Sequence, residues 1–453
     1  MSLITLPFNF SLFPVYFATN ENELMRYEHI GKDLFIKNRE KLKARLKPNS
    51  AVIVCSNDIM PTNADGTMAF RQNSNMLYLS GIDQEESTLI IAPDFPDDRF
   101  KEVLFLRETN EHIAVWEGHK YTEEEAQETS GVQTILWNDK FELTLKTILA
   151  ECEHIYLYHN EHIRNSTEVE TRSDRFSKWI RNTYPNYEYE RLAPEIYDLR
   201  TVKEPREIEL MQEACNITEK AFRRVLKFTK PGTWEYEVEA EFLHEFIRNK
   251  SKGFAYTPII AGGGNACVLH YIENKAQLKD GDLMLLDVGA EYANYNADMT
   301  RTIPVNGRFT KRQREVYDAV LRVKNEANAI LTPGNSIPEY HKEVGKIMTS
   351  ELIGLGLLDQ TDVKNEDPNW PAYKKYFMHG TSHHIGLDVH DVASIYTEFK
   401  PGMVFTIEPG IYIPNEGIGI RLEDDIQITE DGHFNLMRNI PIEAEEIEEI
   451  MNS

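Results

Sequence analysis

The chain has 453 residues, of which 41% are hydrophobic and 27% charged, so it can bury a core and is long enough for two domains. Its formal net charge of -25 repels phosphate backbones and anionic lipids, and we therefore expect neither nucleic acid nor a membrane as a partner. The four scattered cysteines include no CxxC pair, which favours reduced thiols in a cytoplasmic protein and argues against a structural zinc site.

The apolar start of the chain does not have the pattern of a secretory signal. Residues 1–23 lack a basic beginning and a small-residue cleavage site, and they contain Pro7 and Pro14. We expect an extended lead-in here. No run of eighteen apolar residues occurs in the chain, so the sequence predicts no membrane span.

The first part of the chain alternates short strand patterns with helical ones. Strands are predicted at 50–56, 87–93, 102–108 and 154–160, which indicates an α/β domain. A proline-interrupted polar stretch near residues 190–206 then leads into a long amphipathic helix that begins near Pro205. We place the domain boundary there, with an N-terminal domain at 1–195 and a second domain at 196–453.

The second part contains a weak internal repeat. In each half a helix ends before a Pro-Gly pair, Pro231-Gly232 or Pro333-Gly334, and a second helix follows. Residues 279–289 (KDGDLMLLDVG) align without a gap on residues 400–410 (KPGMVFTIEPG), so that Asp287 and Glu408 take the same place. Two such halves facing each other would bring both acids to one central site.

Four acids lie in apolar strand patterns. An ionised Asp287 there costs several kcal/mol unless a cation lies beside it, and an arginine partner or an exposed sheet edge is the alternative. Asp298 follows the polar run EYANYN, which predicts a hairpin with Asp287, although a turn residue would look the same. Glu408 repeats the situation of Asp287, and Glu423 alternates with Arg421 on one strand face, as a solvated face also would. Together the four favour one or two divalent ions such as Mn, Fe, Co or Zn.

The segment HGTSHHIGLDVHD, residues 379–391, supplies imidazoles for such a site. Its HxxxH spacing is half of the HExxH zinc motif, but Gly-Thr-Ser stands in between and the segment is a poor helix, so that motif is excluded. We expect one of these histidines to be a ligand and others to bind substrate or move protons.

The motifs DVGAEYANYNADMTRT, HGTSHHIGLDVHD, TIEPGIYI and GIGIRLEDD resemble, in order and spacing, those of the pita-bread metallopeptidases, above all the Xaa-Pro aminopeptidases (aminopeptidase P) and their relative prolidase. The resemblance covers residues 196–440 and implies an α+β pita-bread catalytic domain with a pseudo-twofold repeat. It implies two divalent metal ions, most often Mn²⁺, bridged by Asp298 and Glu423. The implied metal ligands are Asp287, Asp298, His383, Glu408 and Glu423.

The same resemblance implies roles for the residues around the metals. His270, His379 and His390 match histidines that line the substrate pocket, and His384 matches no ligand. Tyr256 and Arg421 resemble partners of the ligands. In this interpretation a hydroxide held between the metals attacks the Xaa-Pro bond, Glu408 moves a proton, and His270 and His379 stabilise the intermediate or protonate the proline nitrogen. His390 would position the substrate, and Arg421 would orient the ligands.

The N-terminal part helps to choose within the family. FRQNSN and YLSGI, within residues 68–82, resemble the N-terminal domain of bacterial aminopeptidase P. Trp116 is either a core aromatic or part of a segment that reaches a neighbouring subunit, since family members commonly form dimers or tetramers. We therefore expect a homo-oligomeric enzyme that releases the N-terminal residue of peptides with proline in second position. The alternatives are prolidase, which is restricted to dipeptides, and a metal-free pita-bread binding protein or creatinase-like hydrolase that has lost ligands.

Overall fold

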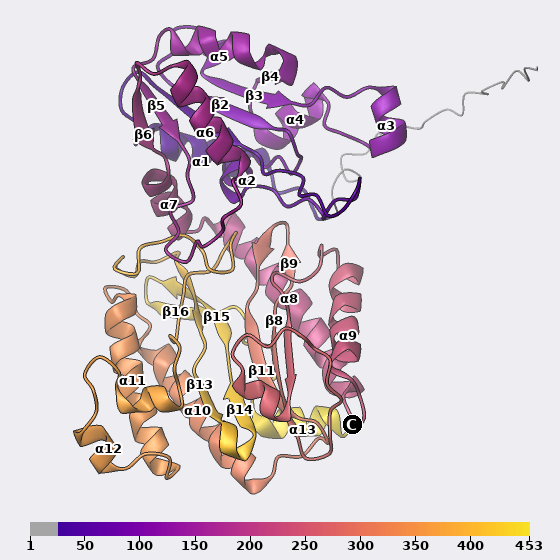
Figure 1. Cartoon of the computed structure of the whole chain (residues 1–453), viewed down its shortest axis with the longest axis vertical. Helices are drawn as coiled ribbons and strands as arrows, with labels where there is room; N and C mark the ends of the chain where they lie inside the picture. The colour runs from indigo at the N-terminus through magenta and orange to yellow at the C-terminus, as the bar shows by residue number, and fades with distance from the viewer. Residues whose placement is uncertain (1–25) are drawn as a thin grey trace, which may run out of the picture.

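The computed structural model describes residues 26–453 and shows two parts, with the N-terminal part above the C-terminal part in Figure 1. The predicted lead-in at residues 1–23 lies outside the described residues. Within them, no helix is long and apolar enough to cross a membrane.

The N-terminal part is an α/β domain, as predicted. Its sheet has the order β4-β3-β2-β1-β5-β6, in which β1–β2 and β2–β3 are antiparallel and the other pairs are parallel. The strands are β1 Ser50–Cys55, β2 Thr88–Ile91, β3 Glu102–Leu106, β4 Thr134–Trp137, β5 His154–Leu157 and β6 Glu188–Arg191. The helices are α1 Lys32–Lys43, α2 Ser74–Ser80, α3 Glu111–Glu117, α4 Glu123–Ser130, α5 Phe141–Leu149, α6 Arg172–Thr183 and α7 Ala193–Thr201.

Strand β1 is buried on both faces, which explains its continuous apolar sequence. Val52 and Val54 belong to one apolar cluster with Leu34 of α1, whereas Ile53 belongs to another with Ile180 of α6. Because successive side chains of a strand point to opposite faces, helices must cover both sides of the sheet.

The C-terminal part consists of two similar halves, which lie side by side in Figure 1. The first half has α8 Pro205–Phe228, α9 Glu235–Arg248 and a sheet of order β11-β8-β7, and the second has α10 Lys311–Ile330, α11 Ile337–Gly354 and a sheet of order β12-β15-β16. The strands are β7 Ile259–Gly262, β8 Leu283–Val288, β9 Glu291–Tyr292, β10 Tyr295–Asn296, β11 Met299–Pro304, β12 Val404–Ile407, β13 Gly410–Ile413, β14 Ile418–Arg421, β15 Asp424–Thr429 and β16 Gly432–Asn435. The remaining helices are α12 Gln360–Lys364 and α13 Ala444–Met451.

The structure bears out the predicted repeat. In each half a loop of equal length, 229–234 or 331–336, joins the two helices, and a strand carrying or preceding the expected acid follows. Asp287 lies in β8, and Glu408 comes directly after β12. Strand β14 packs against β8 and β11, so the second half touches the first where these acids lie.

Helix α8 begins at Pro205, as the sequence predicts, and Pro205 occupies its first turn, where a missing N–H costs nothing. The predicted domain boundary after residue 195 falls inside α7, which packs on α1. The division of the chain stays a prediction, and we propose residues 202–204, between α7 and α8, as the junction.

Candidate active site

A cavity of about 680 Å³ lies where the two halves of the C-terminal part meet. All ten residues singled out from the sequence line it: Tyr256, His270, Asp287, Asp298, His379, His383, His390, Glu408, Arg421 and Glu423. His384 does not line it, because its ring is buried and packs on Phe405 with 4.2 Å between the ring centroids. The fold thus brings together residues that are far apart in the sequence.

The two aspartates are brought together by a hairpin, as predicted. Strands β8 and β11 pair antiparallel, and the tight turn between β9 and β10 has Ala293 and Asn294 at positive φ. The Tyr256 hydroxyl lies 2.6 Å from Asp287 Oδ1 and 2.6 Å from Asp298 Oδ1. One hydroxyl has one proton to donate, so it satisfies only one of these carboxylates at a time.

Glu423 lies in a break between two strands. The alternating pattern of residues 417–429 predicts one continuous strand there, and this prediction is wrong. Strand β14 ends at Arg421 and β15 begins at Asp424. The Glu423 N–H donates to the Thr300 carbonyl at 2.9 Å, and its carboxylate accepts from the Thr300 hydroxyl at 2.6 Å. The predicted shared face of Arg421 and Glu423 nevertheless holds, since both side chains line the cavity.

His383 is oriented toward the acids by its own backbone neighbours. Its Nδ1 lies 2.9 Å from the His384 carbonyl, which leaves Nε2 facing Asp298 Oδ2 at 3.5 Å and Glu408 Oε1 at 3.8 Å. Ligand atoms of Asp298, His383 and Glu423 all lie within 4.8 Å of one another. Oxygen and imidazole donors at this spacing fit a divalent cation.

The charges of the site also call for a cation. Burial raises the pKa of Glu408 to about 7. Burial and the neighbouring carboxylates raise the pKa of Glu423 well above its usual value, and burial raises that of Asp287 although Arg421 opposes the shift. Arg421 donates to Asp287, but a single guanidinium does not balance four carboxylates. Divalent ions would remove this excess of negative charge.

The histidines differ in how free their ring nitrogens are. His379 Nδ1 lies 2.8 Å from the Gly380 carbonyl, and its Nε2 lies 2.7 Å from the Tyr412 hydroxyl, which also accepts from Arg421 at 2.9 Å. Burial, with a smaller effect of Arg421, lowers the pKa of His379 to about 3. His270 is exposed on the cavity wall. The two histidines therefore differ in how accessible their ring nitrogens are to a substrate.

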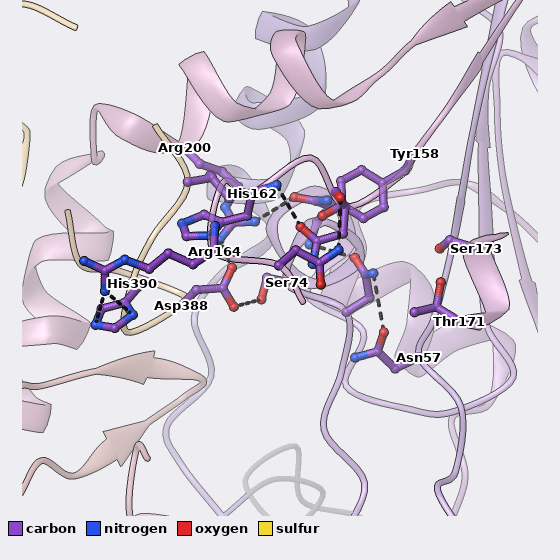
Figure 2. A pocket seen from close by; sticks show the side chains of 15 residues that line it. Asn57, Ser74, Tyr158, His162, Arg164, Thr171, Ser173, Arg200, Asp388 and His390 are labelled. Atoms are coloured by element: carbon purple, nitrogen blue, oxygen red, sulfur yellow. Dashed lines mark hydrogen bonds and ion pairs between the residues drawn. The ribbon is translucent and has the colours of Figure 1, made fainter. Parts of the chain in front are cut away.

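Sequence reasoning missed two titratable residues of the cavity. His341 of α11 accepts the N–H groups of Thr381 and Ser382 at 3.2 and 3.1 Å, and so supports the histidine-rich loop. Arg164 comes from the N-terminal part and contacts His390 (Figure 2), with 2.8 Å between its guanidinium nitrogen and His390 Nδ1. Neither stands in a motif, and a contact that spans 226 residues leaves no local signal.

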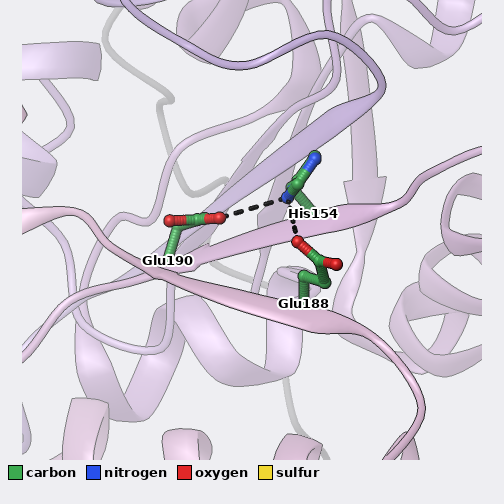
Figure 3. Close-up of side chains that lie close together, drawn as sticks. All are labelled: His154, Glu188 and Glu190. Atoms are coloured by element: carbon green, nitrogen blue, oxygen red, sulfur yellow. Dashed lines mark hydrogen bonds and ion pairs between the residues drawn. The ribbon is translucent and has the colours of Figure 1, made fainter.

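A second group of possible ligand side chains lies in the N-terminal part (Figure 3). His154 Nδ1 is 3.1 Å from Glu190 and 3.4 Å from Glu188, on the paired strands β5 and β6. Lys47 already neutralises Glu190. An ion-pair cluster accounts for this arrangement.

Comparison with known proteins identifies the class of this fold and site. Residues 209–430 match the model of metallopeptidase family M24, and residues 35–158 match that of the aminopeptidase P N-terminal domain. The chain therefore belongs to metallopeptidase family M24, among its aminopeptidase P members.

Individual relatives agree with this assignment over nearly the whole chain. The chain is 37% identical to the Xaa-Pro aminopeptidase of Haemophilus influenzae, over 95% of this chain and 100% of that protein. It is 36% identical to that of Escherichia coli over 93% of this chain and 98% of that one. A substituted Escherichia coli aminopeptidase P, solved in complex with substrate, superposes with a TM-score of 0.84 at 34% identity and covers 94% of this chain and 99% of its own.

Proposed function

We propose that the protein is a metal-dependent exopeptidase that releases the N-terminal residue from peptides whose second residue is proline. The observation that carries this proposal is the convergence of Asp287, Asp298, His383, Glu408 and Glu423 in one cavity that histidines also line. The names of the relatives in family M24 supply the substrate class. Loss of ligands would favour a metal-free binding protein or a creatinase-like hydrolase, and all five positions are intact.

The five ligand residues would hold two divalent ions, and we propose Mn²⁺ as the metal. Asp298, His383 and Glu423, whose ligand atoms lie within 4.8 Å of one another, would form the centre of this ligand set. When bound, such ions polarise the scissile carbonyl and lower the pKa of a water molecule at the site. Arg421 and Tyr256 orient Asp287 through direct hydrogen bonds, which fixes the ligand geometry.

The remaining residues act on the substrate and its protons. Glu408 faces the cavity and accepts the proton of the attacking water. His270, exposed on the cavity wall, then protonates the leaving proline nitrogen or stabilises the intermediate. The bonds of His379 to Gly380 and Tyr412 use both of its ring nitrogens, so we assign it to the wall that contacts the proline ring, where it packs edge-on against Phe377. His390 positions the peptide.

We also propose that the enzyme is a cytoplasmic homo-oligomer. All four cysteines are free thiols, which suits a reducing compartment. Trp116 is not a core residue, since it is 78% exposed, and Val115 beside it on α3 is 67% exposed. Burial of this apolar pair against another subunit would account for it. Light scattering of Trp116→Ala tests this, with dissociation as the expected result.

The activity is tested on metal-stripped protein with and without Mn²⁺, using an Xaa-Pro dipeptide and an Xaa-Pro-Yaa-Zaa tetrapeptide. We expect Mn²⁺-dependent release of the first residue from the tetrapeptide, and none from the Glu408→Ala variant. Cleavage of the dipeptide alone would show a prolidase. No cleavage of either peptide, together with no metal retained by the purified protein, would refute the proposal.

A further inference from the structure

A second cavity, of about 330 Å³, adjoins the catalytic one and lies between the two parts of the chain (Figure 2). Arg164 and His390 line both cavities. A peptide whose first two residues occupy the catalytic cavity would meet these two side chains where it continues. Substrate residues beyond the proline are therefore received by side chains of the N-terminal part.

Arg164, which lines both cavities, stands out because it has no carboxylate partner in the described part of the chain. It lies in the loop between β5 and α6, is exposed, and contacts His390 at 2.8 Å from Nδ1 and 2.9 Å from Nε2. Among residues 26–453, no carboxylate lies within ion-pair distance of it, whereas Arg175 and Arg191 nearby are each paired. The chain has more acidic than basic side chains, so a guanidinium left without a carboxylate is available for one from outside.

The acid that lines this cavity, Asp388, is already occupied. It accepts from Ser74 at 2.8 Å and from Arg200 at 2.6 Å, and Arg200 also donates to Asp391 at 2.6 Å. Arg200 is 2% exposed, and its Nε has no hydrogen-bond partner within the described part of the chain. The cavity therefore offers positive charge and donor groups rather than free negative charge.

The rest of the wall suits a peptide backbone. It consists largely of amides and hydroxyls, which both donate and accept hydrogen bonds. They include Asn57, Asn73, Asn160, Asn165, Tyr158 and Ser173. Alternating carbonyl and N–H groups of an extended peptide find partners on such a surface.

The spacing sets which substrate residue meets Arg164. The rings of His383 and His390 are 4.4 Å apart, and Arg164 contacts the far ring. The two separations together span at most about 7 Å, which is about two residues of extended chain at about 3.3–3.6 Å each. Counted from a scissile bond at the metal ligands, the third residue of the substrate reaches the guanidinium.

We propose that Arg164 binds a carboxylate carried by the third residue of the substrate, and that the inter-domain cavity receives the later residues. The carboxylate is the C-terminus of a tripeptide or the side chain of Asp or Glu in a longer peptide. This inference rests on the proposed Xaa-Pro aminopeptidase activity and names the peptides that the same site prefers.

Steady-state kinetics of the Mn²⁺-loaded enzyme test the proposal. The substrates are two pairs: Xaa-Pro-Ala and its C-terminal amide, and Xaa-Pro-Glu-Ala-amide and Xaa-Pro-Gln-Ala-amide. In Arg164→Gln we expect KM to rise about tenfold for the acidic member of at least one pair and less than about twofold for the neutral member, with kcat nearly unchanged. The pair that responds identifies the source of the carboxylate. Arg164→Lys should recover part of the loss.

Lys178→Ala is the matched control, because it removes a cation from the same domain outside both cavities. Equal losses on acidic and neutral members, or no loss on any substrate, would overturn the role of Arg164. Calorimetric binding of the product Pro-Ala and its amide provides a readout without turnover. Weaker binding of Pro-Ala alone by Arg164→Gln supports recognition of a C-terminal carboxylate, and unchanged binding refutes that source of the carboxylate. Failure of the wild-type enzyme on every peptide would instead count against the proposed function.

Discussion

Replacement of Asp424 by Asn should destabilise the catalytic part strongly, because it leaves two buried cations without their counter-ion. Asp424 accepts from Arg301 at 2.6 Å and also pairs with Lys324, and the three side chains are 3%, 0% and 5% exposed, respectively. Arg301 also donates to the Glu423 carbonyl at 2.6 Å. The cluster thus joins strand β11 of one half to Glu423, a proposed metal ligand, of the other.

The size of the effect follows from burial. Removal of one partner from a buried ion pair costs about 3–5 kcal/mol, since the remaining charge is neither solvated nor paired. For a domain of this size that is about 6–20 °C in Tm. We would compare Asp424→Asn with Glu351→Gln, which breaks the more exposed Arg322–Glu351 pair and should cost about 0–1 kcal/mol. Equal Tm values for the two variants would refute the reasoning.

Three further predictions concern the site and its supports. Gly289→Ala should disrupt the hairpin that carries Asp287, because an added Cβ would lie 1.7 Å from the Ala297 carbonyl, and circular dichroism with metal analysis should show lost structure and lost metal. Tyr256→Phe should keep the fold but reduce metal retention and activity by about tenfold, as is usual for partners of metal ligands; unchanged metal content would contradict this. Burial lowers the pKa of His341 to about 4, so the unfolded state takes up the proton first as pH falls. His341 should therefore contribute roughly 1.4 kcal/mol per pH unit to the decrease in the free energy of unfolding between about pH 6.5 and pH 4, and in urea titrations a His341→Gln variant should show a slope that is smaller by this amount.

Much of the fold was predictable because its signals are local. Strands β1, β2, β3 and β5 of the N-terminal sheet are short apolar runs that could be predicted, and the start of α8 has proline in its first turn. Strands β4 and β6 were not predicted, and β6 has the polar sequence EYER, which carries no strand signal of its own. The repeat was visible because the same pattern of helix, Pro-Gly turn and strand occurs twice. The break between β14 and β15 was not predicted, because it depends on Thr300 of a neighbouring strand, which bonds the Glu423 backbone.

The candidate site divides in the same way. Candidate ligands such as Asp287 and Glu408 could be singled out from the sequence because acids in apolar strand patterns are unfavourable without a nearby cation. Hydrogen-bond partners were harder to predict, since the partner of an imidazole depends on the tertiary fold. The pairing of His379 with Tyr412, for example, left no signal in the sequence. Arg164 was missed because it belongs to a separate domain.

Because the site is divided between two halves, metal binding and the stability of the docked halves should depend on each other. Asp287 and Asp298 come from the first half, whereas Glu408 and Glu423 come from the second. Without cations, the like charges of the two halves oppose their docking. Bound cations would be held by side chains from both halves. Because such ions bind only when the halves are docked, they would stabilise the docked state by mass action. The ions proposed for catalysis would thus also hold the two repeated halves together and stabilise the folded protein.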